Sequence, residues 1–257
     1  MKREGINIEK PSIPLSEEWA ELSAAFCGPE LIKSLGDFFE KNNVRTILEA
    51  ACGDGHVLHG LSQTGIDCVG IDSDDYLLNR AKQINGDPKI SYKKLDVTDL
   101  DKDEELRDKQ FDAVMMRGNS ITALGAWGTD KTTFNPEKCY QMIQATLIKM
   151  WSKVKDGGIL FLDVTRQADI DQGDHEQKIN LGDIHLTGVI TIDQAQKRRD
   201  VFGYGTVNGE YFNGGSSSYL ITPDELKTLL VELLKPQKVW QPTDVQEPLY
   251  EVICAKK

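Results

Sequence analysis

The segment Val44–Gly55 constrains the fold of this chain more than any other part of the sequence. It starts as an apolar run typical of a buried strand, reaches the acid Glu49, and passes through a turn with glycines at positions 53 and 55 into a helical pattern. A second short apolar run, Cys68–Ile71, then ends on Asp72. Strand, glycine turn, helix, strand and terminal acid together predict the first half of a nucleoside-binding doubly wound α/β fold.

The details of the glycine turn indicate which nucleoside it binds. A dinucleotide site has the pattern Gly-x-Gly-x-x-Gly, but here the third glycine position is Leu58. Glu49 and Asp54 lie in or beside the turn, where they would repel a pyrophosphate by roughly 1 kcal/mol or more each. These acids suit a cationic ligand such as S-adenosylmethionine, and Asp72 is placed to accept both ribose hydroxyls. The alternative is a plain strand-turn-helix whose glycines serve only a tight turn.

Further segments extend this pattern in sequence order. They are Leu48–Gly55, Val69–Asp72, Lys94–Val97, Phe111–Met116 and Val154–Leu160. Over residues 44–165 these segments resemble the five motifs of class I S-adenosylmethionine-dependent methyltransferases. The resemblance implies a Rossmann-like, doubly wound, seven-stranded and mostly parallel sheet whose final strand runs antiparallel. One departure is Ala51, where the family usually has glycine; its methyl group restricts the backbone but keeps the loop small.

The resemblance implies S-adenosyl-L-methionine as the cofactor. In the family's third motif an acid faces the adenine amino group and the next backbone amide faces a ring nitrogen, roles that fall on Asp96 and Val97. Arg117, directly after the fourth strand, is included in the donor site, and its pairing with a surface carboxylate is the alternative. The predicted donor-binding residues are Glu49, Ala51, Gly53, Gly55, Asp72, Ser73, Asp96, Val97 and Arg117.

The acceptor site is predicted in the loop Arg117–Leu124, because ligands of open α/β sheets bind beyond the carboxyl ends of the strands. This loop lacks the Asn-Pro-Pro-Tyr pattern that families use on planar nitrogens. It also lacks the Asp and Asn cluster of a magnesium site and the Cys pair or His triad of a zinc site. The sequence therefore predicts no metal.

The segment Gly118–Leu124 is similar to the Gly-Asn-Ser-Phe-x-His-Leu segment of glycine and sarcosine N-methyltransferases. In those enzymes the Asn contacts the substrate, which implies that role for Asn119, whereas the position of their histidine is Ala123 here. They also carry a substrate-binding arginine shortly after the acid that ends the fifth strand. This implies a carboxylate clamp for Arg166, although its spacing from Asp163 is one residue longer. The alternatives are that Asn119 only caps a turn and that Arg166 points elsewhere.

Composition narrows the classes of partner and compartment. The formal net charge of −11 argues against a nucleic-acid partner, which would need clustered lysine and arginine. Five cysteines without metal-type spacing favour reduced thiols in a cytoplasm. No apolar segment follows the N-terminus and no long apolar run occurs, so we expect neither a signal peptide nor a membrane span. The expected partner is a small-molecule substrate, and self-association into a homo-oligomer stays open.

The chain is predicted to consist of an N-terminal arm with helices at 1–43 and a methyltransferase domain at 44–257. Strand-like segments with Asn-Gly turns predict an antiparallel β insertion at about 182–221. Expected strands of the main sheet are 44–49, 67–72, 90–95, 111–116, 159–164, 237–241 and 249–255. Expected helices after the arm are 55–63, 74–84, 103–108, 136–154 and one that starts at Thr222.

The predicted activity is methylation of a small molecule with S-adenosylmethionine as donor, on an amine as in the glycine and sarcosine N-methyltransferases. Methyl transfer from a sulfonium is an in-line displacement that alignment and desolvation can accelerate, which agrees with the lack of an obvious catalytic triad. Two alternatives remain at this point. One is O- or S-methylation of a small molecule on the same fold, and the other is a non-catalytic donor-binding module.

Overall fold

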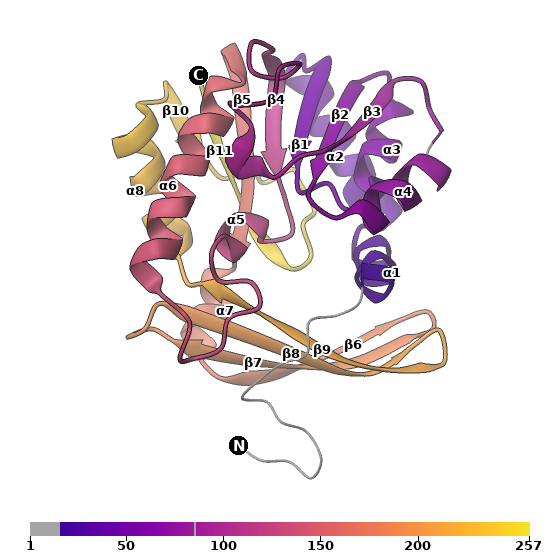
Figure 1. Ribbon diagram of the computed structural model, residues 1–257, viewed down its shortest axis with the longest axis vertical. Helices are drawn as coiled ribbons and strands as arrows, with labels where there is room; N and C mark the ends of the chain where they lie inside the picture. Colours follow the sequence, from indigo (N-terminus) through magenta and orange to yellow (C-terminus); the bar gives the residue numbers. More distant parts are fainter. Residues whose placement is uncertain (1–15, 85) are drawn as a thin grey trace.

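The computed structural model describes residues 16–84 and 86–257, so the first 15 residues of the predicted N-terminal arm with helices at 1–43 lie outside the described residues. The structure has two layers of sheet, and Figure 1 shows the smaller sheet below the larger one. The helices are α1 (Ser16–Phe26), α2 (Pro29–Lys41), α3 (His56–Ser62), α4 (Asp75–Ile84), α5 (Ser120–Ala123), α6 (Pro136–Ser152), α7 (Gln167–Gln172) and α8 (Pro223–Leu234), with a short 3-10 helix η1 (Val97–Asp99). The strands are β1 (Thr46–Ala50), β2 (Asp67–Asp72), β3 (Ile90–Lys94), β4 (Phe111–Met116), β5 (Val154–Thr165), β6 (His175–Leu181), β7 (Ile184–Asp193), β8 (Arg198–Val207), β9 (Glu210–Tyr219), β10 (Lys238–Trp240) and β11 (Tyr250–Lys256).

The large sheet has seven strands in the order β10-β11-β5-β4-β1-β2-β3. Neighbours from β3 to β5 are parallel, and β11 pairs antiparallel with both β5 and β10. This arrangement confirms the predicted Rossmann-like, mostly parallel sheet. The strand order changes direction between β1 and β4. The carboxyl ends of these two central strands therefore flank a crevice at one edge of the sheet, where such folds bind ligands.

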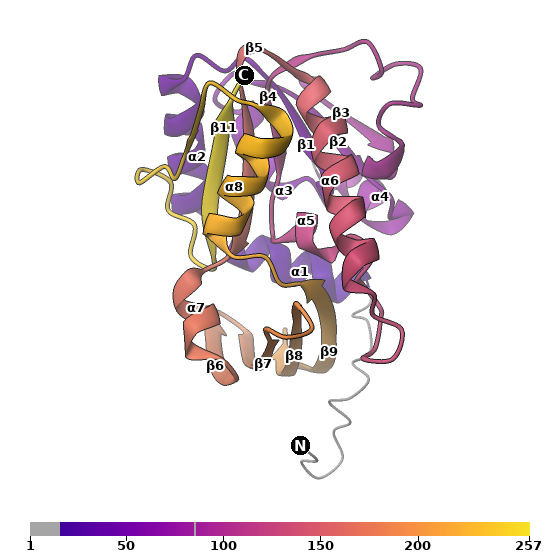
Figure 2. The ribbon, with the colours of Figure 1, turned by 90° about the vertical axis from the view of Figure 1, so that its left-hand side faces the viewer.

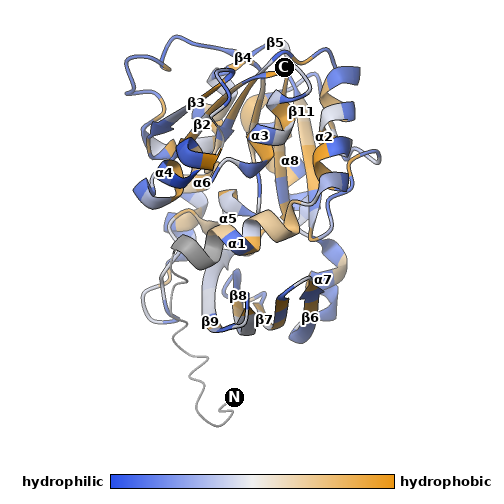
Figure 3. Ribbon diagram, turned by 90° about the vertical axis from the view of Figure 1, so that its right-hand side faces the viewer, coloured by the Kyte–Doolittle hydropathy of each residue, from blue (hydrophilic) through white to orange (hydrophobic). Residues whose placement is uncertain are grey.

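Apolar side chains bury the large sheet on both faces. One cluster joins the sheet to α6 and α8 and contains Val114, Leu160 and Leu230, all fully buried. The other joins the opposite face to α2 and α3 through Phe39 and Phe161, whose ring centroids lie 5.8 Å apart. Figure 3 shows hydrophobic residues along the strands and on the helix faces turned toward them. The two covered faces leave only the strand ends free to form a site.

Side-chain caps fix where two helices of this layer begin. At α8 the Thr222 hydroxyl accepts from the backbone N–H of Glu225 while the Glu225 carboxylate accepts from the backbone N–H of Thr222, a reciprocal capping box. At α6 the Asn135 side chain accepts from the backbone N–H of Lys138, and proline follows at the first helical position. The predicted start of the helix after Thr222 is correct.

The second sheet is antiparallel and has four strands in the order β6-β7-β8-β9. It includes the predicted insertion but begins at His175, earlier than the expected 182. The strand β6 carries little signal in its sequence, because an edge strand that alternates between exposed and half-buried positions has few apolar residues. Figures 1 and 2 both place α1 between the two sheets, and Leu22 of α1 packs with Leu186 and Phe212 of the small sheet.

Two further expectations differ from the structure. The segment expected as a helix at 103–108 forms turns, because the Asp103 carboxylate accepts from the backbone N–H groups of Glu105 and Leu106 and so competes with helical hydrogen bonding. The fifth strand begins at Val154 instead of 159, with a register shift opposite β4. No helix within residues 16–84 and 86–257 is long and apolar enough to cross a membrane.

Candidate functional site

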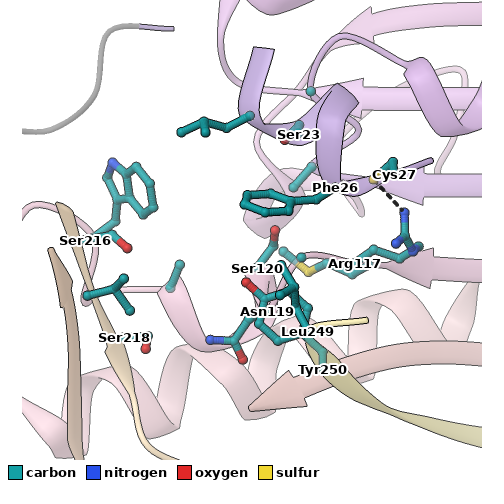
Figure 4. A pocket seen from close by; sticks show the side chains of 18 of the residues that line it. Ser23, Phe26, Cys27, Arg117, Asn119, Ser120, Ser216, Ser218, Leu249 and Tyr250 are labelled. Atoms are coloured by element: carbon teal, nitrogen blue, oxygen red, sulfur yellow. Dashed lines mark hydrogen bonds between the residues drawn. The ribbon is translucent and has the colours of Figure 1, made fainter. Parts of the chain in front are cut away.

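A cavity of about 670 Å³ lies between the carboxyl edge of the large sheet, α1 and one face of the small sheet. Ligand pockets of this size are typical of small-molecule sites. Figure 4 shows side chains that line it: Phe26 comes from α1, Asn119 from the loop after β4, Ser120 from α5, and Ser216 and Ser218 from β9. The site therefore combines the Rossmann-like layer with the antiparallel insertion.

The turn after β1 has left-handed backbone at three positions. The φ angles are 56° at Ala51, 56° at Gly53 and 69° at Gly55. A Cβ on Gly55 would lie 2.2 Å from the Tyr92 hydroxyl, so glycine is required there by close packing as well as by φ. Ala51 and Gly53 line the cavity, whereas Gly55 supports the turn from behind.

Asp72 ties this turn to the end of β2. Its two carboxylate oxygens accept from the backbone N–H groups of Gly53, at 2.8 Å, and Asp74, at 2.9 Å. Burial raises the pKa of Asp72, and these two backbone donors oppose that shift. The side chain lines the cavity, and each carboxylate oxygen has a further lone pair for a ligand hydroxyl.

Glu49 is a buried acid at the end of β1 with only 4% of its surface exposed. Its Oε2 atom has no hydrogen-bond partner among the described residues. Burial raises the pKa of Glu49 to about 8, with Arg117 lowering it and the nearby acids Asp163 and Asp72 raising it. Because a buried polar atom is costly without a partner, this carboxyl fits a ligand that brings a hydrogen-bond donor or a positive charge.

The third strand brings two more predicted donor-binding residues to the cavity. Asp96 caps η1, accepting from the Thr98 backbone N–H at 2.8 Å and from its hydroxyl at 2.6 Å. Val97 follows as a buried residue, and Ser73 lines the same cavity from the end of β2. The ends of β2 and β3 therefore lie side by side, as the parallel register of Asp72 with Lys94 requires.

Arg117 lies in the cavity wall and is paired within the protein. Its Nη2 donates to Glu247 at 2.7 Å, and the two side chains are only 8% and 6% exposed. Burial disfavours the cation, but Cys27, Glu247, Asp163 and Glu49 around it raise the pKa of Arg117 above its usual value. The partner predicted as the alternative was a surface carboxylate, whereas Glu247 is buried.

The loop after β4 is held by the acid of β5. Asp163 accepts from the backbone N–H groups of Asn119, at 2.6 Å, and Gly118, at 3.0 Å. Burial and Glu247 raise the pKa of Asp163 to about 7, while Arg117 and these two backbone donors lower it. The contacts fix Asn119 in left-handed backbone with φ of 58° at the start of α5.

Asn119 presents an unpartnered amide to the cavity. It is 6% exposed, and its Oδ1 has no hydrogen-bond partner among the described residues. In Figure 4 its amide points away from Arg117 and toward the side of the pocket where Ser216 and Ser218 lie. A buried carbonyl oxygen in this state is ready to accept from a ligand N–H or O–H.

Arg166 is the predicted residue whose side chain is engaged elsewhere. Its Nε and Nη2 donate to Asp169 at 3.0 and 3.1 Å, and its Nη1 donates to the Pro248 carbonyl at 3.2 Å. Asp169 lines the cavity, but Arg166 is not among the lining residues. The spacing between Asp163 and Arg166 is one residue longer than in the glycine and sarcosine N-methyltransferases. In this structure Arg166 binds the neighbouring Asp169 and does not line the cavity.

The described residues bring most of the predicted site together. Every predicted donor-binding or acceptor residue except Gly55 and Arg166 lines the one cavity. Sequence reasoning missed Arg199, Glu247 and Tyr250, which reach the cavity from β8 and from the segment that leads into β11. Within residues 16–84 and 86–257, no three His, Cys, Asp or Glu side chains are grouped as metal ligands.

The comparisons with known proteins agree with this geometry. Residues 47–132, which contain the glycine turn and the ends of β1 to β4, match the family model described as a methyltransferase domain. S-adenosylmethionine is the methyl donor, and the residues present fit it: the acids Glu49, Asp54 and Asp72 line the cavity around the turn. The Glu49 Oε2 atom has no hydrogen-bond partner among the described residues.

Solved structures share the fold of the described residues. The methyltransferase CcbJ from Streptomyces caelestis superposes with a TM-score of 0.68 at 13% identity, covering 88% of this chain and 89% of that one. A sugar N-methyltransferase from Streptoalloteichus sp. gives 0.63 at 14% identity, covering 100% and 98%. An S-adenosylmethionine-bound amino pentose methyltransferase from Micromonospora echinaspora gives 0.64 at 14% identity, covering 99% of both chains. No curated protein matches the chain in sequence.

Proposed function

We propose that this chain transfers a methyl group from S-adenosylmethionine to an amine nitrogen of a small molecule. The observation that carries the proposal is Asn119, a buried amide whose carbonyl oxygen has no partner among the described residues and faces the cavity beyond the donor end. An amine N–H that donates to this oxygen would be oriented by a group that cannot itself titrate. The sugar N-methyltransferase and the amino pentose methyltransferase among the solved structures support the same class of acceptor.

The donor would be held by the residues at the carboxyl ends of β1 to β3. Asp72 would accept from the ribose hydroxyls, and Asp96 with the backbone of Val97 would meet the adenine edge. The Glu49 carboxylate would face the amino-acid end of the donor, with Ala51 and Gly53 letting backbone approach closely. Arg117 is paired with Glu247, so its part here is to fix the wall beside Glu49.

When bound, the donor supplies an electrophilic methyl group on a positively charged sulfur. In the transfer, the nitrogen lone pair forms one N–C bond while one C–S bond breaks and leaves its electron pair on sulfur. The new ammonium then loses a proton. The work of the chain is to select an unprotonated amine, to align it and to exclude water. Asp163 serves that alignment by fixing the backbone of Gly118 and Asn119.

The shape of the cavity favours an acceptor larger than glycine, which departs from the expectation drawn from glycine and sarcosine N-methyltransferases. Residues from all four strands of the small sheet line the cavity, from His175 in β6 to Ser218 in β9. The carboxylate clamp expected of Arg166 has no support in this cavity, because that side chain binds Asp169.

Radiolabelled S-adenosylmethionine with a panel of amines, carboxylates, phenols and thiols tests the proposal. We expect label to appear on amines, and turnover confined to phenols or thiols would contradict the nitrogen assignment. Donor binding without turnover across the panel would indicate a non-catalytic module. Asn119→Gly keeps the left-handed backbone while removing the amide, so it should lower turnover at least tenfold and leave S-adenosylhomocysteine binding within about twofold.

A further inference from the structure

On the face of the small sheet that lines the cavity, one row of paired residues consists of glycines and therefore has no side chains. Gly188 pairs with Gly203, and Gly203 pairs with Gly214, so three neighbouring strands present backbone without side chains to the cavity. A Cβ on Gly188 would come no closer than 3.7 Å to any described atom outside its chain neighbours, which is an ordinary contact. Packing within the described residues therefore does not require glycine at 188, and the space above it is open to a ligand.

Arg199 lies on the same face of the sheet, and among the described residues it is a cation without a counter-ion of its own. It sits on β8 opposite Ser218 of β9 and lines the cavity. Its Nε is buried and has no hydrogen-bond partner in the described part of the chain. Burial lowers the pKa of Arg199, as expected for a cation withdrawn from water, while Tyr250, Asp169 and Asp200 nearby oppose that shift.

The two acids whose charge raises the pKa of Arg199, Asp169 and Asp200, are each bound by a different arginine. Arg166 holds Asp169 with two hydrogen bonds, and Arg198 holds Asp200 with contacts of 2.8 to 2.9 Å. Both carboxylates are therefore occupied by other arginines, and Arg199 itself lines the cavity. Arg199 is half-buried, and its buried Nε has no partner among the described residues, so its guanidinium is stabilised when an anionic ligand pairs with it.

Charge is distributed unevenly around the cavity. Acids gather at the donor end, where Glu49, Asp72 and Asp96 suit the cationic donor. The other arginine of the lining, Arg117, is neutralised by Glu247. The small-sheet wall instead combines Arg199 with the hydroxyl of Ser216, which can donate a hydrogen bond to an anion. The Ser218 hydroxyl beside it donates to the Arg199 carbonyl oxygen.

We propose that the amine acceptor carries an anionic group, a carboxylate or a phosphate, which binds Arg199 while its body lies over the Gly188–Gly203–Gly214 row. This inference rests on the proposed function, because it places the anion at the far end of the molecule whose amine meets Asn119. A planar guanidinium matches both kinds of anion with paired N–H donors.

Ligand binding in the presence of saturating S-adenosylhomocysteine tests this without requiring turnover. Two pairs of probes differ only in the anion and carry it away from the amine: 6-aminohexanoate against 6-aminohexanamide for a carboxylate, and glucosamine 6-phosphate against glucosamine for a phosphate. For one pair, we expect the wild-type protein to bind the anionic member at least tenfold more tightly in calorimetry. Arg199→Gln should remove that preference, Arg199→Lys should retain part of it, and Arg107→Gln, which changes an exposed arginine, should retain all of it.

The outcomes separate the two proposals. Equal binding of anionic and neutral members by the wild type in both pairs would overturn the anion site, as would an unchanged preference in Arg199→Gln. Either result leaves the proposed function standing if amines are methylated. Conversely, an Arg199-dependent preference without any amine methylation would support the anion site and contradict the proposed function. An unchanged thermal midpoint of each variant without ligand shows that the comparison concerns folded protein.

Discussion

Left-handed backbone marks both turns that face the cavity. Ala51 and Asn119 have φ angles of 56° and 58°. For alanine that conformation costs roughly 1–2 kcal/mol, whereas asparagine tolerates it better. The surrounding contacts compensate: Cys52 N–H donates to the Ile71 carbonyl, and Asp163 accepts from the backbone of Asn119. Strain held at two loops that share a pocket is typical of a functional site.

Asp72 should contribute to donor affinity more than to the core. Asp72→Ala removes a charged acceptor for the ribose hydroxyls and frees the Gly53 N–H that it binds. We expect S-adenosylhomocysteine to bind about ten- to a hundredfold more weakly, or roughly 1.5–3 kcal/mol, in calorimetry. Asp67→Ala, at the exposed opposite end of the same strand, is the matched control and should bind normally. Unchanged affinity in a folded Asp72→Ala protein would remove Asp72 from the site.

Donor residues could be predicted because each lies within a few positions of a strand end that hydrophobic patterning locates. The rest of the site depends on contacts between distant segments. Arg117 forms a hydrogen bond with Glu247, which lies 130 residues away in the sequence, and no local sequence pattern predicts that pair. The role of Arg199 could not be predicted from the sequence either, because it depends on Arg166 and Arg198 binding the nearby acids. Family spacing indicated Arg166, and only the packed structure shows Asp169 beside it.

At the scale of elements, the alternation of strands and helices in the main sheet was predictable, because buried parallel strands read as short apolar runs. The seven strands and their mostly parallel pairing agree with that prediction. Elements that depend on pairing were harder to predict. β6 takes its conformation from seven residue pairs with β7, although its own sequence is largely polar. In the acidic turn at 103–108, side-chain capping by Asp103 competes with helix formation.

Gly55 joins α3 to β3 by close packing and gives an element-scale prediction. Gly55→Ala would add the left-handed cost, roughly 1–2 kcal/mol, to a clash with Tyr92 worth roughly another 1–3 kcal/mol. Gly65 also has positive φ, at 93°, but a Cβ added there would have no described atom beyond its chain neighbours within 4 Å, so Gly65→Ala isolates the first cost. In urea unfolding we expect Gly55→Ala to lose clearly more stability than Gly65→Ala. Equal losses would show that Tyr92 moves aside freely.

At the scale of the whole molecule, the ligand cavity is the place where two sheets with separate cores meet. The large sheet supplies acids at its strand ends, and the small sheet supplies a bare, partly cationic wall. The chain has a formal net charge of −11. The resulting negative electrostatic field attracts a cationic donor but opposes the approach of an anionic acceptor. A local cation at Arg199 therefore gains importance, because it must offset that field at the acceptor end.

The buried acids of the site make the stability of the free protein fall as pH rises. The pKa of Glu49 is raised from 4.5 to about 8, and that of Asp163 from 3.8 to about 7. Between about pH 5 and 7 the unfolded chain has released both protons while the folded chain retains them. The free energy of unfolding should then decrease by as much as about 1.4 kcal/mol per pH unit for each group.

Urea unfolding at pH 5, 6, 7 and 8 measures this slope, which should flatten above about pH 8 when Glu49 is ionised in both states. Glu49→Gln cannot ionise, so it should remove its share of the slope and be the more stable protein at pH 8. Half-buried acids with lowered pKa, such as Asp112, act mainly below about pH 4 and leave this window unaffected. Saturating donor should oppose the effect, because a cation beside Glu49 favours the carboxylate. A stability that rises steadily from pH 5 to 8 without ligand would contradict the assignment of Glu49 as a protonated, ligand-ready acid.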